Sequence, residues 1–252
     1  MRFDAVILAG SRGPQDALAH HAGVSDKALI SFEGRPMLAH VIAAVRSAGA
    51  GRIAVSSNSA PVRALAQQCG AEVLDAAAGP SGSAAAALDH LGTPLLVATA
   101  DHPLLQREWI TQFLAACPAY ADIAALLAER SVVEAAAPET RRTYLRFADG
   151  DWSGCNLFFC ATPAARGAID LWRSIEADRK RPWRIVRRLG PRMLLGYLTG
   201  RLALATAVRR LGALTGARAA IVASPFGEAA IDVDKPADIA LVRDLLAARR
   251  TG

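Results

Sequence analysis

A continuous apolar run, PLLVATA, occupies residues 94–100 and ends directly before Asp101. A strand with apolar residues on both faces is typical of parallel sheets that helices cover on both sides. An acid directly after such a strand lies at the carboxyl edge of the sheet, where open α/β sheets bind their ligands. The run therefore predicts an α/β protein with a mostly parallel central sheet and makes Asp101 a candidate site residue.

Apolar runs and helical patterns alternate along most of the chain. Residues 3–9 (FDAVILA) predict a strand that ends at Gly10, and residues 36–48 carry apolar positions at helical spacing after a starting proline. Residues 122–128 fit either a strand or a buried helix. Further strands are predicted at 52–57, 71–74, 154–160 and 218–224, and further helices at 60–69, 83–91, 107–116, 163–177, 191–215 and 236–249.

Length and composition limit the class of protein. A chain of 252 residues with 52% apolar content predicts one α/β domain over residues 1–252. No apolar run reaches the roughly 18 residues that span a bilayer. The first residues carry an acid, Asp4, where a secretory signal would carry positive charge. We therefore expect a cytoplasmic protein. The cysteines lack the spacing of a zinc site or a disulfide framework and are expected to be reduced thiols: Cys69, Cys117, Cys155 and Cys160.

The net charge of +6 is concentrated in one part of the chain. Eleven basic residues and no acid lie between Asp178 and Glu228, and a basic helical segment is expected at about 179–215. The segment fits a solvated helical face, or an interfacial helix on an anionic membrane, which would place the protein peripherally at the inner membrane surface. The membrane alternative favours cytidylyl transfer to a lipid headgroup or its precursor. No helix-turn-helix pattern or aromatic platform indicates nucleic acid.

A glycine turn after the first strand is the first candidate ligand site. Gly10 lets backbone N–H groups approach phosphate oxygens, and Arg12 and Lys27 can offset the charge of a triphosphate. The turn matches neither G-x-x-x-x-G-K-[ST] nor G-x-G-x-x-G, which disfavours the two commonest nucleotide-binding folds.

Five short motifs in a fixed order resemble a known family. The order LAG-x-R, DKAL, GRPML, TADHP and IDVDKPADI resembles the MobA-like NTP transferases, the nucleotidyltransferases related to molybdenum-cofactor guanylyltransferase. Methylerythritol-phosphate cytidylyltransferase and adenosylcobinamide-phosphate guanylyltransferase are similar in outline. The resemblance covers nearly the whole chain and implies a three-layer, Rossmann-like nucleotidyltransferase fold of the GT-A-like type.

The resemblance also implies roles for individual residues. Asp101 would be a metal ligand, with Asp232 or Asp234 as the second acidic ligand. Asn156 would contact the acceptor, and Arg12 and Lys27 would hold the phosphates. The nucleotide would contact Leu8, Ala9 and Gly10, with Ser11 in place of the family's usual second glycine, and its base or ribose would be bound near Ser81, Gly82 and Ser83.

The chemistry of nucleotidyl transfer explains why these residue types suffice. An acceptor phosphate is already an ionised nucleophile and pyrophosphate is an adequate leaving group, so no general base is required. The site must hold two anions in line and neutralise developing charge, a task for Mg²⁺ and fixed cations. We therefore expect transfer of a nucleoside monophosphate from a nucleoside triphosphate to a small phosphorylated acceptor, with Mg²⁺ held by carboxylates and substrate phosphates.

Several alternatives remain open from the sequence. Asp101 could cap the next helix, and Asp234 could cap the helix that starts near Pro236. His102 is assigned a structural role because the mechanism needs no acid or base. A GT-A-type glycosyltransferase would usually carry Asp-x-Asp after the same strand, whereas this chain has Asp101-His102-Pro103. A non-catalytic, membrane-associated nucleotide-binding protein is the alternative outside enzymes.

Overall fold

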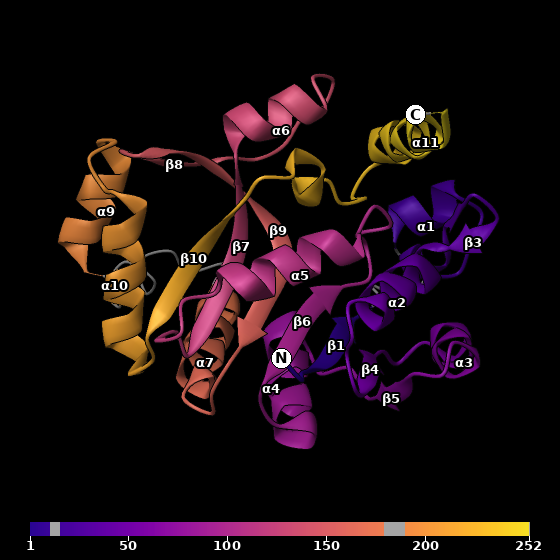
Figure 1. Ribbon diagram of the computed structural model, residues 1–252, viewed down its shortest axis with the longest axis horizontal. Helices are drawn as coiled ribbons and strands as arrows, with labels where there is room; N and C mark the ends of the chain where they lie inside the picture. The colour runs from indigo at the N-terminus through magenta and orange to yellow at the C-terminus, as the bar shows by residue number, and fades with distance from the viewer. Residues whose placement is uncertain (11–15, 179–189, 252) are drawn as a thin grey trace.

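A computed structural model describes residues 1–10, 16–178 and 190–251. Figure 1 shows a central sheet with helices packed around it. The sheet has eight strands in the order β10-β7-β9-β6-β1-β4-β5, with β8 paired to β9. The strands are β1 (Asp4–Leu8), β4 (Ile53–Ser56), β5 (Glu72–Leu74), β6 (Leu95–Thr99), β7 (Ile123–Glu129), β8 (Leu145–Phe147), β9 (Gly150–Cys160) and β10 (Ala219–Ser224).

The sheet is mixed but mostly parallel. Strands β6, β1, β4 and β5 run parallel to one another, as do β7 and β10. Strand β9 lies between the two groups and is antiparallel to both β6 and β7. The prediction of an α/β fold with a mostly parallel sheet is confirmed.

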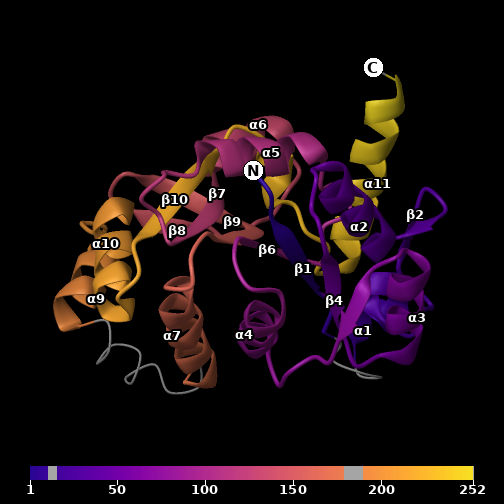
Figure 2. The same ribbon diagram turned by 60° about the horizontal axis from the view of Figure 1, so that its bottom comes forward.

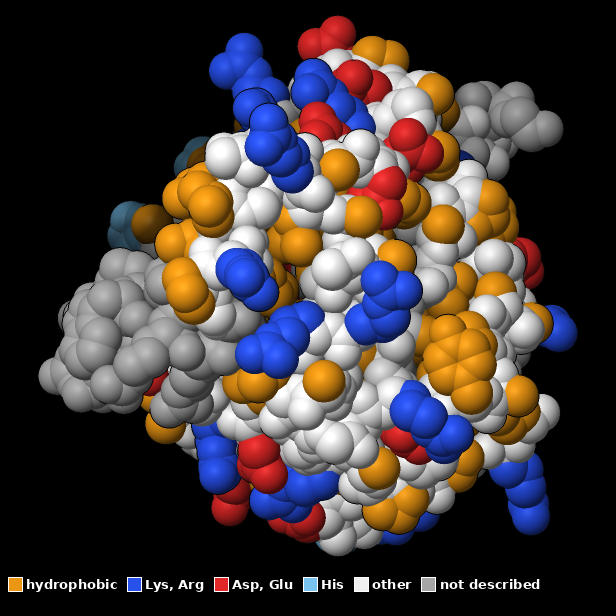
Figure 3. Space-filling model, turned by 90° about the vertical axis from the view of Figure 1, so that its left-hand side faces the viewer, with side chains coloured by type: hydrophobic (Ala, Val, Ile, Leu, Met, Phe, Trp, Pro, Cys, Tyr) orange, Lys and Arg blue, Asp and Glu red, His pale blue; other side chains and the backbone are white. Residues whose placement is uncertain are grey.

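Helices cover both faces of this sheet. The helices are α1 (Ala17–His21), α2 (Met37–Ser47), α3 (Ala60–Gln68), α4 (Pro80–Leu91), α5 (Arg107–Ala116), α6 (Arg130–Ala136), α7 (Ala165–Ala177), α9 (Pro191–Leu198), α10 (Leu204–Thr215) and α11 (Pro236–Thr251). In Figure 2, α5 and α6 lie on one side of the sheet and α4 and α7 on the other. Helices α9 and α10 stand at the β10 end, and their side of the molecule faces the viewer in Figure 3.

The apolar run that ends at Asp101 is buried on both faces. In β6, Leu95 and Val97 join the core cluster formed with α4 and α7. Leu96 and Ala98 point the other way and join the larger cluster that includes residues of α2 and α5. Alternate residues of β6 therefore pack against the two helical layers, as the sequence predicted.

Some boundaries differ from those expected. Helix α4 begins at Pro80, and β9 begins at Gly150, within a stretch that is polar in sequence. The region 122–128 is strand β7, because it pairs with both β9 and β10. The helical region 191–215 contains two helices, and Gly200, between them, has a positive φ of 67°. The predictions did not include α1, α6, β8, the 3-10 turn η2 (Lys27–Leu29) or the hairpin of β2 (Ser31–Phe32) and β3 (Arg35–Pro36).

Two further expectations concern the cysteines and the membrane. The four thiols are free, and burial raises the pKa of Cys155 and Cys160 to about 12, so both are neutral at physiological pH. None of the described helices combines the length and apolarity needed to cross a membrane.

The packing of β6 predicts the effect of a core truncation. Leu96 is 0% exposed, so L96A should lower the free energy of unfolding by about 2–5 kcal/mol, through lost burial and a residual cavity. Leu145 in β8 is 46% exposed, and L145A should change it by less than about 0.5 kcal/mol. Urea unfolding of the parent and both variants measures these changes in the free energy of unfolding. An equal decrease in L96A and L145A would contradict this packing.

Candidate functional site

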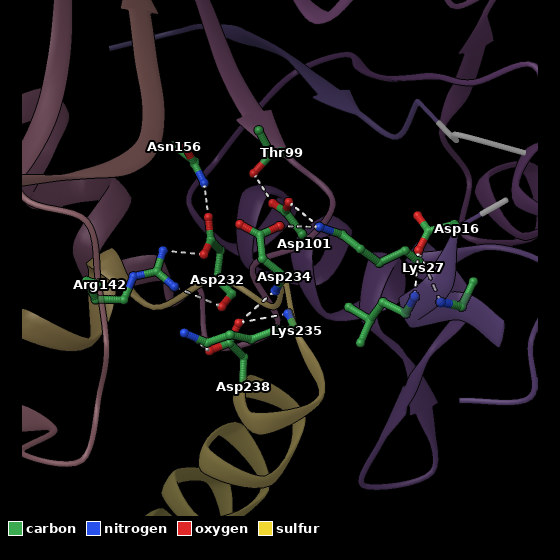
Figure 4. A network of polar contacts seen from close by, with 12 residues as sticks. Asp16, Lys27, Thr99, Asp101, Arg142, Asn156, Asp232, Asp234, Lys235 and Asp238 are labelled. Carbon is green, nitrogen blue, oxygen red and sulfur yellow. Dashed lines mark hydrogen bonds and ion pairs between the residues drawn. The ribbon is translucent and has the colours of Figure 1, made fainter. Parts of the chain in front are cut away.

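Three aspartates from two distant parts of the chain meet at the carboxyl edge of the sheet. Asp101 follows β6, whereas Asp232 and Asp234 lie in the segment before α11. Carboxylate oxygens of the three residues lie within 4.8 Å of one another. The backbone N–H of the buried Val233 donates to the carbonyl of Asp101 at 2.9 Å and so fixes the two segments side by side. Figure 4 shows the three carboxylates converging on one point.

Lys27 joins two of these carboxylates. Its ammonium lies 2.8 Å from Asp101 and 2.7 Å from Asp234 (Figure 4). The Lys27 side chain is 23% exposed, and burial favours its neutral form; the charges and hydrogen bonds of the two aspartates nevertheless raise its pKa above the ordinary value. Lys27 is therefore a charged lysine that offsets part of the repulsion between the acids.

The turn that carries Lys27 is anchored on both sides. Asp26 is buried and accepts a 2.6 Å hydrogen bond from the hydroxyl of Ser59, just after β4. On the other side, the N–H of Met37 donates to the carbonyl of Ile30 at 2.8 Å, and the β2–β3 hairpin lies between them. The motifs DKAL and GRPML are thus two ends of one structural unit, which explains their spacing in the sequence.

Asp101 has contacts that do not fit a helix cap. Its carboxylate accepts hydrogen bonds from the hydroxyl of Thr99 and from Lys27. Burial favours the neutral acid, but these partners lower the pKa of Asp101 below its usual value. Helix α5 begins only at Arg107, with Gln106 at its N-cap. The capping alternative for Asp101 is therefore wrong for this structure.

Asp232 is bound by residues on the side of the cluster away from Lys27. Its carboxylate accepts hydrogen bonds from the guanidinium of Arg142 and, at 2.6 Å, from the side-chain amide of Asn156. Burial and the nearby charges of Asp101 and Asp234 raise the pKa of Asp232, although Arg142 acts in the other direction. Asp232 is therefore held between a cation on one side and two further acids on the other.

Asn156 reaches Asp232 because β9 is irregular at this position. The pairing register of β7 and β9 shifts between Ala125 and Leu127, opposite this part of β9. Asn156 has a φ of +54°, in the left-handed region that asparagine tolerates better than most residues. The irregularity interrupts the strand alternation and lets a polar side chain at this position bond to Asp232.

Asp234 is not the residue that caps the last helix. The carboxylate of Asp238 accepts from the N–H groups of Asp234 and Lys235 at 2.9 and 3.0 Å. The carboxylate of Asp234 instead bonds to Lys27, and its side chain is 62% exposed. The capping alternative for Asp234 is therefore wrong, and its carboxylate faces the shared acidic site.

The glycine turn lies beside Asp101. The N–H of Ala100 donates to the carbonyl of Leu8, and the N–H of Ala9 donates to the carbonyl of Ser56, both at 3.0 Å. Leu8 and Ala9 are buried, whereas Gly10 is exposed and a Cβ atom built on it would meet nothing within 4 Å. Ser11 and Arg12 lie outside the described residues.

Ser81, Gly82 and Ser83 form part of the first turn of α4. The N–H and hydroxyl of Ser81 both donate to the carboxylate of Glu176 in α7. The hydroxyl of Ser83 accepts from the N–H of Ala77 at 3.0 Å. Among the described contacts, none joins these residues to the three aspartates. They share the carboxyl edge because α4 connects β5 to the parallel strand β6.

His102 is a structural residue next to the site. Its side chain is 2% exposed and lies against Trp109, with ring centroids 5.7 Å apart. Burial lowers the pKa of His102 to about 4, so its imidazole is neutral at physiological pH. This environment agrees with the structural role expected from the sequence.

The family follows from a match over most of the chain. Residues 5–191 match the MobA-like NTP transferase domain. The chain belongs to the MobA-like NTP transferase family. It is therefore an enzyme of the nucleotidyltransferase type, and the family that the ordered motifs indicated is confirmed; the last motif, IDVDKPADI, lies after the matched residues. No curated protein matches the chain.

Solved structures agree with this fold. A hypothetical transferase from Thermus thermophilus has 33% sequence identity and a TM-score of 0.79, covering 95% of this chain and 100% of that one. CMP:2-keto-3-deoxy-manno-octonic acid synthetase, solved with CTP, has 16% identity and a TM-score of 0.59 over 98% of each chain. A nucleotidyl transferase from Methanothermobacter has 16% identity and a TM-score of 0.57, covering 98% of this chain and 99% of that one.

Sequence reasoning missed three residues of this MobA-like site. The contact between Thr99 and Asp101 could have been predicted, because Thr99 lies two positions before Asp101 at the end of a strand and side chains two positions apart share a face. The carboxylate of Asp238, near the start of α11, accepts from the N–H groups of Asp234 and Lys235, a role that the sequence offered only as an alternative for Asp234. Arg142 lies in a loop without periodicity, and no sequence pattern pairs it with Asp232.

The contact between Asn156 and Asp232 predicts a pH-dependent difference in stability between two substitutions. N156G keeps the left-handed backbone and removes one hydrogen bond, whereas N156D sets a second carboxylate against Asp232. Like-charge repulsion raises the pKa of a folded acid, so N156D should be less stable than N156G at neutral pH. Its deficit should shrink as falling pH protonates the pair. Thermal unfolding at several pH values measures this gap, and a gap that does not change with pH would contradict it.

Proposed function

We propose that the protein transfers a nucleoside monophosphate from a nucleoside triphosphate to a small phosphorylated acceptor and releases pyrophosphate, with Mg²⁺ as cofactor. The observation that carries the proposal is the cluster of Asp101, Asp232 and Asp234, with Lys27 bound to two of them, beside the Gly10 turn. Membership of the MobA-like family supports the reaction type. The acceptor and the metal requirement are our own inference.

The donor set suits a hard divalent cation. Mg²⁺ prefers oxygen ligands at about 2.1 Å in octahedral geometry and combines a few carboxylates with substrate phosphates. Asp101, Asp232 and Asp234 would hold it, since their carboxylate oxygens lie within 4.8 Å of one another. Lys27, which binds Asp101 and Asp234 here, would pass to the triphosphate oxygens when the ion binds. When bound, the ion would neutralise triphosphate charge and stabilise the pyrophosphate leaving group.

The nucleotide would occupy the space in front of the glycine turn. The open position beside Gly10 allows a phosphate to approach the backbone N–H groups. In our proposal Arg12 and Lys27 contact triphosphate oxygens, and Leu8, Ala9, Gly10 and Ser11 contact the nucleotide. We also keep Ser81, Gly82 and Ser83 as the candidate contacts for the base or ribose.

In the proposed reaction, the acceptor phosphate is held in line with the bond between the α-phosphorus and the pyrophosphate leaving group. An oxygen of the acceptor phosphate attacks the α-phosphorus of the triphosphate and forms a new P–O bond. The bond from the α-phosphorus to the oxygen that bridges to the β-phosphorus breaks, and pyrophosphate carries away its electron pair. No proton moves, which agrees with the neutral, buried His102.

The acceptor would bind on the Arg142 side of the acids. Asn156 and Arg142 both contact Asp232, and a guanidinium is suited to a phosphate. Among the described residues, four of the six buried polar side-chain atoms without a hydrogen-bond partner belong to residues 140–152. They are Thr140 Oγ1, Arg142 Nε, Tyr144 OH and Trp152 Nε1. Unpaired buried polar atoms are costly, and a polar acceptor here would supply partners.

The alternative functions receive less support. A glycosyltransferase would need a second acid close to Asp101 in sequence, whereas His102 is buried and neutral. A non-catalytic binding protein would not need three converging carboxylates, whose mutual repulsion costs stability.

Removing the charge of Asp101 tests the proposal. D101N should lower kcat for pyrophosphate release by roughly 100- to 1000-fold, the usual size of one lost electrostatic contact in a transition state. D244N, at an exposed acid in α11, is the matched control and should keep full activity. Chelation of divalent ions should abolish turnover of the parent protein. If no nucleoside triphosphate, with Mg²⁺ and a panel of phosphorylated acceptors, gave turnover or thermal stabilisation, the proposal would fail.

Neighbouring arginines test the acceptor side. R142Q should raise the acceptor KM by roughly 10- to 100-fold, the range expected for a lost charged hydrogen bond, and leave the nucleotide KM nearly unchanged. R141Q removes the same charge one residue away, at an exposed position, and should change neither constant. Steady-state kinetics with each substrate varied separates the effects. A parallel rise of both constants in R142Q would assign Arg142 to support of the acidic cluster instead.

A further inference from the structure

Helices α9 and α10 form a hairpin at one end of the sheet, which we call the basic hairpin (residues 190–215). Helix α9 has no buried residue, and two of its leucines, Leu195 and Leu198, are 63% and 71% exposed. They lie three positions apart and therefore share one side of the helix. Leu195 and Leu198 therefore form an apolar strip that faces solvent.

The basic hairpin is attached firmly to the sheet. The N–H of Ala148 donates to the carbonyl of Leu202 at 2.9 Å, and the N–H of Leu204 donates to the carboxylate of Asp149 at 2.8 Å. The ring of Tyr197 packs edge-on against Phe147. These contacts join the hairpin to the β8–β9 turn, so the exposed strip has a fixed orientation on the molecule.

The basic hairpin that carries the apolar strip also carries exposed arginines. Arg192, Arg201, Arg209 and Arg210 are exposed and form no ion pair with any acidic side chain that the structure describes. Residues 179–227 contain 11 of the 29 basic residues of the chain and none of its 23 acids. The remaining 18 basic residues are outnumbered by the acids, so the net positive charge of the protein resides in this part of the sequence.

A cavity opens between the two helices. Its volume is about 550 Å³, and Arg192 and Arg210 line it together with Met193 and Leu202. Two guanidinium groups beside apolar side chains match a phosphate with hydrocarbon attached to it. Figure 3 shows Lys and Arg side chains spread among hydrophobic ones on this face of the molecule.

We propose that the basic hairpin docks on the surface of an anionic lipid bilayer. Leu195 and Leu198 enter the interface, and the four exposed arginines contact lipid phosphates. Combined apolar and basic residues on one helical surface are typical of peripheral membrane contacts. A nucleic acid fits less well, because Tyr197, the aromatic residue of the hairpin, packs against Phe147 and offers no free stacking surface. Among the described contacts, none joins the basic hairpin to Asp101, Asp232 or Asp234, so the docking surface is distinct from the proposed catalytic site.

Vesicle sedimentation of the full chain tests the docking. The protein should sediment with vesicles of phosphatidylcholine and phosphatidylglycerol, remain in solution with phosphatidylcholine alone, and dissociate as salt rises. R192Q/R210Q should reduce the partition coefficient roughly 25-fold, since each basic residue near an anionic surface contributes about fivefold. R107Q/R243Q removes two exposed charges outside the hairpin and should bind like the parent.

The leucines give a second, independent measurement. L195Q/L198Q should lose binding, whereas L195M/L198M keeps apolar side chains and should retain it, with unchanged unfolding midpoints for both. The proposal is overturned if the parent binds both vesicles equally or neither, if the glutamine variants bind like the parent, or if the protein binds DNA or RNA fragments but no vesicles. Pyrophosphate release in lipid-free buffer, measured in parallel, distinguishes a failure of docking from a failure of the proposed reaction.

Discussion

Repulsion among three carboxylates governs the arrangement of the site. Burial and the charges of Asp101 and Asp234 raise the pKa of Asp232, so cations beside the cluster of Asp101, Asp232 and Asp234 stabilise its ionised form. Lys27 offsets the charge of the exposed side of the cluster and Arg142 that of the buried side. Removing one partner of a buried ion pair lowers the free energy of unfolding, so each cation has a structural role as well as any role in binding.

The fold explains how distant residues meet. Parallel strands β1 and β6 end at the same edge, so the Gly10 turn and Asp101 lie side by side through the bond from Ala100 to Leu8. The segment before α11 returns to this edge and is fixed there by the bond from Val233 to Asp101. The sheet therefore supplies a rigid frame, and short polar segments after its strands supply the chemistry.

Much of this arrangement could be predicted from the sequence, where local patterns reflect global packing. The PLLVATA run indicated a strand buried on both faces, and the ordered motifs indicated the family. The partners of the acids were harder to predict. Arg142 comes from an aperiodic loop, and the left-handed backbone of Asn156 depends on a shift in register between β7 and β9. Such features arise from tertiary contacts that no local pattern encodes.

The location of a bound divalent ion tests the account most directly. Crystals grown with Mn²⁺ and a non-hydrolysable nucleoside triphosphate would give an anomalous difference peak at the ion. The account predicts a single strong peak in contact with Asp101 and at least one of Asp232 and Asp234, with the triphosphate reaching the same ion from the Gly10 turn. A bound nucleotide with no peak at these carboxylates, or with its phosphates directed away from them, would contradict it.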